Sequence, residues 1–475
     1  MKRIFFICLI IAVQFNVFAQ TENNSISAKI DSLFSEFNSF DSPGAAVVIT
    51  RNDKIIFQKE YGSANLEYGV PINSNTVFHI GSVSKQFTAF AILLLEEKNK
   101  ISLNDDIRKY LPELPDFGDT IHIRHLLHHT SGLREIETLL QICGISTADQ
   151  IDGRQIMSLL LMQRKLNFKP GDEIEYCNTG YFLLARIVER VTGEPFPQWT
   201  KENIFVPLGM NDSRFYNDCT EIVKNRAYPY WIPGEDNKLV KGILSYSYAG
   251  PTSVFTTSTD IAKWLINFSN KKIGGEKIIN KMLNETDTLN NGEVLDYGYG
   301  VGVTTHNGSK VILHSGQDAG YRAADLYYPD SKIGIAILSN FYSINPMSYG
   351  FKISDLFLEN KTKANIEESI QNAGQENDNK EPEHYSPASG ELKDYEGKYF
   401  CDELETQYTL IIDKDKLTAK HWRNEDTKLT AVSPGCFEGN QSWFQTIDFI
   451  RDNYNNILGF NLTSGRARNL FFRKM

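Results

Sequence analysis

Cysteine is scarce in this sequence, and the spacing of the few cysteines indicates neither a metal site nor a redox site. Six of the 475 residues are cysteine, and no two form a CxxC pair. A fold held together by disulfides or by a structural zinc ion is therefore excluded. After Cys8 the remaining ones are Cys143, Cys177, Cys219, Cys401 and Cys436. This number is odd, so at least one thiol is expected to stay unpaired or to pair between chains.

Positive charge is in deficit. Lys and Arg together number 49 against 59 Asp and Glu, which gives a formal net charge of -10. Nucleic acids and anionic membranes bind basic surfaces, so neither is an expected partner. The hydrophobic fraction of 41% is ordinary for a globular protein, and no internal repeat is evident. The length predicts about two to four domains.

Long hydrophobic runs are absent outside the N-terminus. Lys2 and Arg3 precede the apolar stretch Ile4–Val13, which is shorter than the roughly 20 residues of a membrane-spanning helix. Val17-Phe18-Ala19 then offers a signal-peptidase site. We expect residues 1–19 to be a cleaved signal peptide, with a membrane anchor as the alternative. The mature protein is expected to be exported, periplasmic or secreted, without a membrane span.

A change in composition divides the rest of the chain. Residues 359–392 are rich in Asn, Glu, Lys, Gln and Pro and are predicted to be a linker after a first domain of residues 20–358. Residues 393–475 alternate short apolar segments with turn residues, which indicates an up-and-down barrel or a sandwich. Its predicted strands are Tyr395–Phe400, Tyr408–Ile412, Leu417–Trp422, Leu429–Val432, Trp443–Phe444, Ile447–Arg451, Leu458–Leu462 and Leu470–Arg473.

The larger domain has strand patterns at both ends and helical patterns between them. A helix is predicted over residues 25–38, and a hairpin over Ala45–Thr50 and Ile55–Tyr61. Phe87–Leu95 is apolar on almost every side, as in a helix buried within a domain. Three further strands are predicted downstream, at Lys310–His314, Tyr321–Tyr328 and Ile333–Ser339. This order predicts an α/β domain whose sheet is assembled from both chain ends and covered by helices.

The strongest local signal is Gly81-Ser82-Val83-Ser84-Lys85, which opens the buried helix. A serine and a lysine three residues apart lie on one helical face, about one turn from each other. The helix N-terminus stabilises a developing alkoxide, and the lysine can take the serine proton if desolvation or another cation lowers its pKa. The pattern alone also fits a capped helix with a surface lysine. The apolar helix that follows makes a freely solvated Lys85 unexpected.

Tyr176-Cys177-Asn178 precedes the amphipathic helix Tyr181–Val191. A phenol beside a lysine ammonium can ionise more easily and serve as general base and acid. An asparagine amide can donate to a substrate carbonyl and accept from a lysine. The alternative is that Asn178 or Thr179 simply caps the helix.

His314-Ser315-Gly316-Gln317 ends a predicted strand. A glycine in a strand lets another backbone or a ligand approach closely, and a free strand edge there could bind an extended substrate. The backbone N–H groups of Gln317 and Ser82 could together form an oxyanion hole. The alternative is an ordinary turn after a strand.

In this order the three motifs resemble the penicillin-recognising serine hydrolases: AmpC-type β-lactamases, D-alanyl-D-alanine carboxypeptidases, D-aminopeptidases and related esterases. Thr120–Leu133, Gly250–Trp264 and Tyr297–Gly302 also look like family segments, so the resemblance covers about residues 25–350. It implies an α/β (α+β) β-lactamase/transpeptidase-like domain, with an antiparallel sheet flanked by helices. The C-terminal all-β barrel resembles the lipocalin-like domain appended to many members.

The resemblance also implies a role for each residue. Ser82 would be the nucleophile, while Lys85 and Tyr176 would move its proton and later activate the hydrolytic water. The implied substrate-binding residues are Asn178, His314, Ser315, Gly316 and Gln317. No cofactor is implied.

Two further groups of residues could suggest other chemistry. His125, His128 and His129 are spaced like metal ligands on a helical face, but no nearby Asp, Glu or Cys completes a site, and we expect no metal. Cys177 is expected to be a small buried filler, because no adjacent histidine is placed to activate it.

His314 occupies the place where classical β-lactamases carry a lysine, whereas H-x-G is similar to the motif of D-aminopeptidase-like members, which argues against a dedicated β-lactamase. A lysine is a fixed cation at pH 7, whereas a solvated histidine, with a pKa of about 6.5, is mostly neutral. Binding of the carboxylate of β-lactams or of D-Ala-D-Ala is therefore expected to weaken. The Glu-x-x-x-Asn element of class A β-lactamases is also missing, which leaves Tyr176 and Lys85 for deacylation.

The sequence thus predicts an exported serine hydrolase that cleaves a small amide or ester, a β-lactam or a D-amino-acid peptide, through an acyl-enzyme on Ser82. Its expected partner is a small-molecule or short-peptide substrate. A carboxylesterase on the same site is one alternative, and a penicillin-binding sensor with little turnover is another. A non-catalytic protein would be expected to lose Ser82, Lys85 or Tyr176. The sequence predicts neither the role of the barrel nor the oligomeric state.

Overall fold

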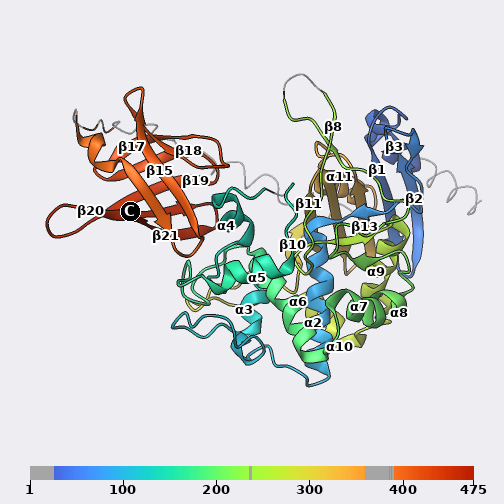
Figure 1. The fold of residues 1–475 in the computed structure, drawn as a ribbon. Coiled ribbons are helices and arrows are strands. Elements are labelled where there is room, and N and C mark those ends of the chain that lie inside the picture. The colour runs from blue at the N-terminus through green and yellow to red at the C-terminus, as the bar shows by residue number, and fades with distance from the viewer. Residues whose placement is uncertain (1–25, 147, 235–237, 359–384, 386, 388–389) are drawn as a thin grey trace, which may run out of the picture.

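The chain forms a large domain around an open sheet and a separate small barrel (Figure 1). The computed structural model describes residues 26–146, 148–234, 238–358, 385, 387 and 390–475. The predicted signal peptide (residues 1–19) and most of the predicted linker (residues 359–392) lie outside these residues. Among them, no helix is long and apolar enough to cross a membrane.

The large domain is organised by a six-stranded antiparallel sheet in the order β10-β11-β12-β13-β1-β2. Its strands come from both ends of the domain, as predicted, because β1 pairs with β13: Val47 lies opposite Ile337. The strands are β1 (Ala45–Arg51), β2 (Lys54–Tyr61), β10 (Gly302–His306), β11 (Ser309–Asp318), β12 (Tyr321–Tyr328) and β13 (Ile333–Ser339).

Helices cover both faces of the sheet, which explains why β1 is apolar on both sides. Ala46 and Val48 pack into the core that holds α2 (Lys85–Glu97) and α9 (Ser258–Asn270). Val47 belongs to the opposite core, with helical residues 26–33 and α11 (Pro346–Ser354). The remaining helices are α3 (Ile123–Leu127), α4 (Ile136–Ile142), α5 (Gly153–Leu161), α6 (Asn178–Thr192), α7 (Phe196–Thr200), α8 (Val206–Leu208) and α10 (Gly275–Asn284).

The central helix α2 is buried within the domain, as predicted for Phe87–Leu95. Every residue from Lys85 to Leu95 is buried, and α2 packs against α6 in the helical layer (Figure 1). The first predicted helix is shorter than expected: residues 26–33 are helical, and a short 3-10 turn follows at Ser35–Phe37. Short strands complete the domain: β3 (Ser63–Asn65), β4 (Val70–Pro71), β5 (Phe78–His79), β6 (Arg214–Phe215), β7 (Tyr230–Trp231), β8 (Val240–Lys241) and β9 (Val254–Thr256).

The C-terminal part is a closed antiparallel barrel in which each strand pairs with the next and β21 pairs with β14, consistent with a lipocalin-like barrel. Two predictions need correction. Phe444 of the predicted strand Trp443–Phe444 begins β19, which also contains Ile447–Arg451, and Trp443 lies in the turn before it. β18 was missed because Phe437 is its only large apolar residue. The strands are β14 (Gly397–Cys401), β15 (Thr406–Asp413), β16 (Lys416–Lys420), β17 (Thr427–Ser433), β18 (Cys436–Gln441), β19 (Phe444–Arg451), β20 (Ile457–Ser464) and β21 (Ala467–Lys474).

The barrel docks on the large domain beside α4 (Figure 1). A buried ion pair joins Arg134 to Glu403, with 2.6 Å between Nη1 and Oε2. The hydroxyl of Tyr408 donates to the carbonyl of Ile142 at the end of α4. Because buried charges and hydroxyls of one unit have their partners in the other, the two units form a specific interface.

Candidate active site

A pocket of about 860 Å³ brings the three sequence motifs together. This volume lies within the range of small-molecule sites. Lys85 lies fully buried behind Ser82, beneath the pocket floor. Every other predicted site residue lines the pocket: Ser82, Tyr176, Asn178, His314, Ser315, Gly316 and Gln317.

Ser82 stands just before the buried helix rather than on its first turn. Residues Gly81–Ser84 form a short 3-10 turn, and α2 begins at Lys85. Two glycines let this turn lie against β11. A Cβ on Gly316 would lie 1.9 Å from the carbonyl oxygen of Ile80, and a Cβ on Gly81 would lie 2.6 Å from the nitrogen of Gln317. The close approach expected at Gly316 is therefore that of the backbone carrying Ser82.

The amine of Lys85 has three oxygen partners. Its Nζ lies 3.1 Å from Ser82 Oγ, 2.7 Å from Asn178 Oδ1 and 2.9 Å from the carbonyl oxygen of Pro251. An ammonium can donate to all three. A neutral amine can donate to the amide and carbonyl oxygens and direct its lone pair at the serine hydroxyl. The site can therefore hold the lysine in either protonation state.

Burial lowers the pKa of Lys85 well below its ordinary value, because desolvation penalises the ammonium; Glu135 and Glu137 oppose this change, and Arg466 adds to it. The ammonium would otherwise be the stable form at neutral pH. The ring of Tyr176, 4.6 Å from Nζ, covers one side of the amine. A lysine with a lowered pKa next to a serine hydroxyl can act as a general base.

Tyr176 lies beside Ser82, but its proton is held more tightly than the sequence suggested. Desolvation raises the pKa of the Tyr176 phenol, and the neighbouring Ser82 hydroxyl opposes this only in part. We expected the neighbouring lysine to ease ionisation, and burial outweighs that effect. A protonated phenol can donate a proton and relay it, whereas Lys85 is the better resting base.

The loop of Tyr176 is fixed by His129. The backbone N–H of Cys177 donates to His129 Nδ1 at 3.0 Å, and the imidazole ring packs 4.3 Å from the Tyr176 ring. The N–H of Glu175 donates to the carbonyl of His129. His129 has a positive φ of 61°, a conformation few residues other than glycine adopt.

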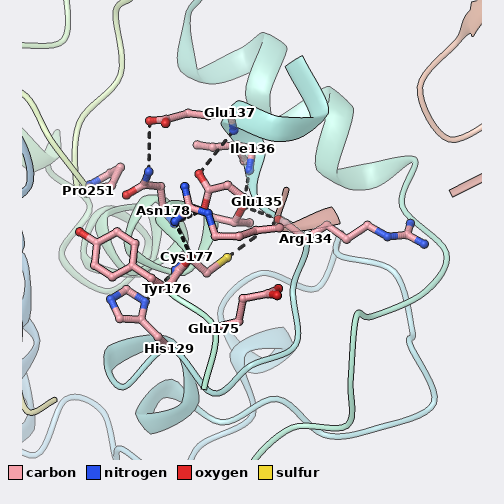
Figure 2. A network of polar contacts seen from close by, with 12 residues as sticks. His129, Arg134, Glu135, Ile136, Glu137, Glu175, Tyr176, Cys177, Asn178 and Pro251 are labelled. Carbon is pink, nitrogen blue, oxygen red and sulfur yellow. Dashed lines mark hydrogen bonds and ion pairs between the residues drawn. The ribbon is translucent and has the colours of Figure 1, made fainter. Parts of the chain in front are cut away.

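Asn178 is held by two glutamates, as Figure 2 shows. Its backbone N–H donates to Glu135 Oε2 at 2.5 Å, and its Nδ2 donates to Glu137 Oε1 at 3.1 Å. This second bond orients the amide so that Oδ1 faces Lys85. The alternative, in which Asn178 or Thr179 only caps the helix, does not explain these contacts. No side-chain cap is formed at this end of α6.

His314 lies within β11 and is neutral. The strand continues to Asp318, so the third motif does not end it. Burial, together with a smaller effect of the Lys85 charge, lowers the pKa of His314 to about 3. Its Nε2 faces the hydroxyl of Tyr297 at 3.1 Å. The departure from lysine therefore leaves no fixed positive charge at this position.

β11 also places the Gln317 backbone beside Ser82. In the β11–β12 ladder, Asp318 lies opposite Tyr321 and Gln317 opposite Arg322. A Cβ on Gly316 would lie 3.0 Å from the Ser82 nitrogen, so the two backbone segments are in contact. Two backbone N–H groups brought this close can bind one developing oxyanion.

Sequence reasoning missed five charged residues of the site. Glu137, Asp318, Arg322 and Arg466 line the pocket, and Glu135 lies fully buried behind it. The glutamates follow the family segment Thr120–Leu133 almost directly, which was an available signal. Arg466 lies in a barrel turn, 290 residues after Tyr176 in the chain. The sequence gives no signal that these two residues are in contact.

The histidine cluster and Cys177 have other partners. His128 Nδ1 contacts the carbonyl of Tyr297, and His125 Nδ1 accepts from the backbone of His122. In the part of the chain that the structure describes, no group of three metal-ligating side chains occurs. Cys177 is buried, its thiol faces the Leu133 carbonyl, and burial raises its pKa to about 12, so it stays protonated.

Comparison with known proteins places the chain in a family. The Beta-lactamase family model matches residues 30–347. Penicillin-binding protein 4* of Bacillus subtilis is 30% identical over 329 residues, 66% of this chain and 71% of that protein. The D-aminopeptidase of Brucella anthropi is 26% identical over 312 residues, 64% of this chain but only 57% of that protein.

A solved structure extends the similarity to the barrel. The octameric penicillin-binding protein homologue from Pyrococcus abyssi superposes with a TM-score of 0.62 at 24% identity, and the match covers 94% of this chain and 100% of that chain. At this identity the match shows the fold alone. The sequence matches cover the large domain, which carries the three motifs. The chain therefore belongs to the beta-lactamase family of serine hydrolases.

Proposed function

We propose that this chain is an exported hydrolase that cleaves a small amide or ester through an acyl-enzyme on Ser82. The observation that carries the proposal is the set of contacts of the Lys85 amine. Asn178 Oδ1 and the Pro251 carbonyl accept two N–H groups, and Ser82 Oγ lies 3.1 Å away at the third position. Export is supported by the sequence of residues 1–19.

Acylation transfers one proton and exchanges one bond. Lys85 takes the proton of Ser82 while Oγ bonds to the substrate carbonyl carbon, and the N–H groups of Ser82 and Gln317 bind the oxyanion. The C–N or C–O bond then breaks, and the leaving group takes a proton from Lys85 through Tyr176. Water, activated by the same two groups, hydrolyses the ester and returns the proton to Ser82.

The charges of the pocket favour a substrate with a free amino group. Glu137 and Asp318 have neutral partners, an amide and the Thr252 hydroxyl, and burial raises the pKa of both carboxyls. A substrate ammonium would favour their ionised forms. A substrate carboxylate would be repelled by these two carboxyls when they are ionised, and no lysine at position 314 would offset the repulsion.

The pocket arginines are engaged elsewhere. Arg322 donates to the Tyr342 carbonyl and to the side chain of Gln317, and Arg466 donates to the Tyr176 carbonyl. The proposed substrates are therefore amides or esters of D-amino acids or of short D-amino-acid peptides with a free N-terminus. One relative named above is a D-aminopeptidase, which agrees with this choice.

The test compares five chromogenic substrates on the full mature chain. D-alanine p-nitroanilide is expected to be hydrolysed at least about tenfold faster, in kcat/KM, than its N-acetyl derivative, because only the free amine can pair with Glu137 and Asp318. The L-alanine anilide and nitrocefin serve as controls. Equal rates for the free and acetylated anilides would contradict amine recognition, and cleavage of nitrocefin alone would favour a β-lactamase. Hydrolysis of p-nitrophenyl acetate without any anilide would favour a carboxylesterase.

His314→Lys is expected to shift the preference toward carboxylates. A lysine there restores a positive charge beside the pocket, so the ratio of kcat/KM for nitrocefin over p-nitrophenyl acetate should rise about tenfold. His314→Gln, which adds no charge, is the matched control. If the lysine variant leaves this ratio where the wild type has it, position 314 does not contribute to carboxylate recognition.

A further inference from the structure

One turn of the barrel enters the active site of the large domain. The hairpin β20–β21 closes over two residues, Gly465 and Arg466, between the paired Ser464 and Ala467. Gly465 has a φ of +50°, as the first central position of a type II′ turn requires. Its N–H is held within the barrel by the side chain of Gln445 at 2.9 Å.

Arg466 is bound to the large domain through its main chain. Its carbonyl oxygen accepts from the backbone N–H of Glu135 at 3.1 Å and from Asn167 Nδ2 at 3.0 Å. A Cβ on Gly465 would lie 3.2 Å from the Thr138 hydroxyl, so the turn is packed tightly on α4. The position of the arginine is therefore determined from both units.

The side chain of Arg466 reaches the catalytic loop. Nη1 donates to the main-chain carbonyl of Tyr176 at 2.6 Å, and the guanidinium lies 5.5 Å from the centre of the Tyr176 ring. The same Nη1 is 3.9 Å from Glu135 Oε2, the carboxylate oxygen that accepts from the Asn178 backbone. One guanidinium thus binds the Tyr176 carbonyl directly and lies near the carboxylate that holds the Asn178 backbone.

A charge at this place is needed because Glu135 is fully buried. A buried carboxylate without a cation is strongly unfavourable. If Lys85 were the cation that compensates Glu135, it would be held in its protonated form and could not easily accept a proton. Arg466 remains protonated at any relevant pH, so it can supply the positive charge beside Glu135 in place of Lys85.

We propose that Arg466 is a positioning residue for the hydrolase chemistry proposed above, so that the barrel completes the active site of the large domain in the same chain. It holds the Tyr176 carbonyl and compensates Glu135. The acyl-transfer groups are then held in place only when the barrel is docked. This inference rests on the proposed function of Ser82 and Lys85.

The charges around Lys85 give the direction of the expected pH effect. Arg466 lowers the pKa of Lys85, while Glu135 and Glu137 raise it against the dominant effect of burial. Removing the guanidinium therefore raises the pKa of Lys85, and the neutral amine forms only at higher pH. The titratable groups that face Lys85 from all sides are Glu135, Glu137, Tyr176, Cys177, Tyr181, His129, His314, Asp318 and Arg466.

The test measures p-nitrophenyl acetate hydrolysis and fluorophosphonate labelling against pH, on the full chain. Arg466→Gln should lower kcat about tenfold or more with little change in KM, and should move the acid limb to higher pH. Arg466→Lys should keep the limb near its wild-type position and recover only part of kcat. Arg468→Gln, which removes a docking arginine bound to Glu173 and Glu175, is the matched control and should keep the wild-type limb.

Two results would overturn the inference. One is a wild-type pH profile in Arg466→Gln; the other is an equal change in Arg468→Gln, which would indicate docking alone. Thermal unfolding identifies a variant that does not fold. If Arg466→Gln does not fold, the kcat of Arg466→Lys tests the inference, because it is expected to be only partly recovered. A wild-type chain that reacts with neither probe contradicts the proposed function instead, and this is seen before any variant is compared.

Discussion

Ser82→Ala is expected to abolish acylation and to lower turnover by about 10⁴-fold or more, because no other group replaces the attacking oxygen. The fold should persist. The hydroxyl is one of three oxygen partners of Lys85, and Asn178 and Pro251 remain. The free energy of unfolding should change by only about 1 kcal/mol. Intact-mass spectrometry with a fluorophosphonate and a fluorescent penicillin, together with thermal unfolding, measures both effects.

The two reagents separate the remaining alternatives. A wild-type penicilloyl adduct that persists indicates a sensor, and one that decays indicates a β-lactamase. Labelling by fluorophosphonate alone agrees with the proposed amine-bearing amide or ester substrates. Ser343→Ala, on the rim of the same pocket, is the matched control and should label like the wild type. Full activity in purified Ser82→Ala would falsify the mechanism.

The fold was predictable because local patterns and chain order agreed. The hairpin of β1 and β2 and the burial of Phe87–Leu95 follow from apolar patterning alone. β18 escaped prediction because a barrel strand with a polar exterior and one large buried residue, Phe437, carries little signal. β18 forms because it pairs with β17 and β19 in the closed barrel, and its own sequence gives no signal of this pairing.

The site was predictable as motifs but not as an electrostatic environment. Ser82, Tyr176 and His314 were found because their neighbours follow family patterns. That Tyr176 holds its proton depends on how deeply the hydroxyl is buried, which no spacing reveals. The contribution of Arg466 requires the docking of two separately patterned units, and the patterns within a single sequence give no signal of that docking.

Lys85→Met is expected to reduce acylation of Ser82 by about 10³-fold, the usual contribution of a general base. The methionine fills similar volume in the buried site but offers neither a lone pair to Ser82 nor donors to Asn178 Oδ1. Fluorophosphonate labelling rates, measured from about pH 5 to 9, give the size of the effect.

Lys85→Arg distinguishes proton transfer from charge alone. The guanidinium keeps a cation near Ser82 but cannot lose its proton in this pH range. Desolvation lowers the pKa of Lys85, so wild-type labelling should rise as pH increases through that lowered value and then level off as the neutral amine predominates. The arginine variant should label slowly and show no such rise. If Lys85→Arg reproduced the wild-type rate and profile, the lysine would act as an electrostatic group, and the Ser82 proton would have to leave through Tyr176.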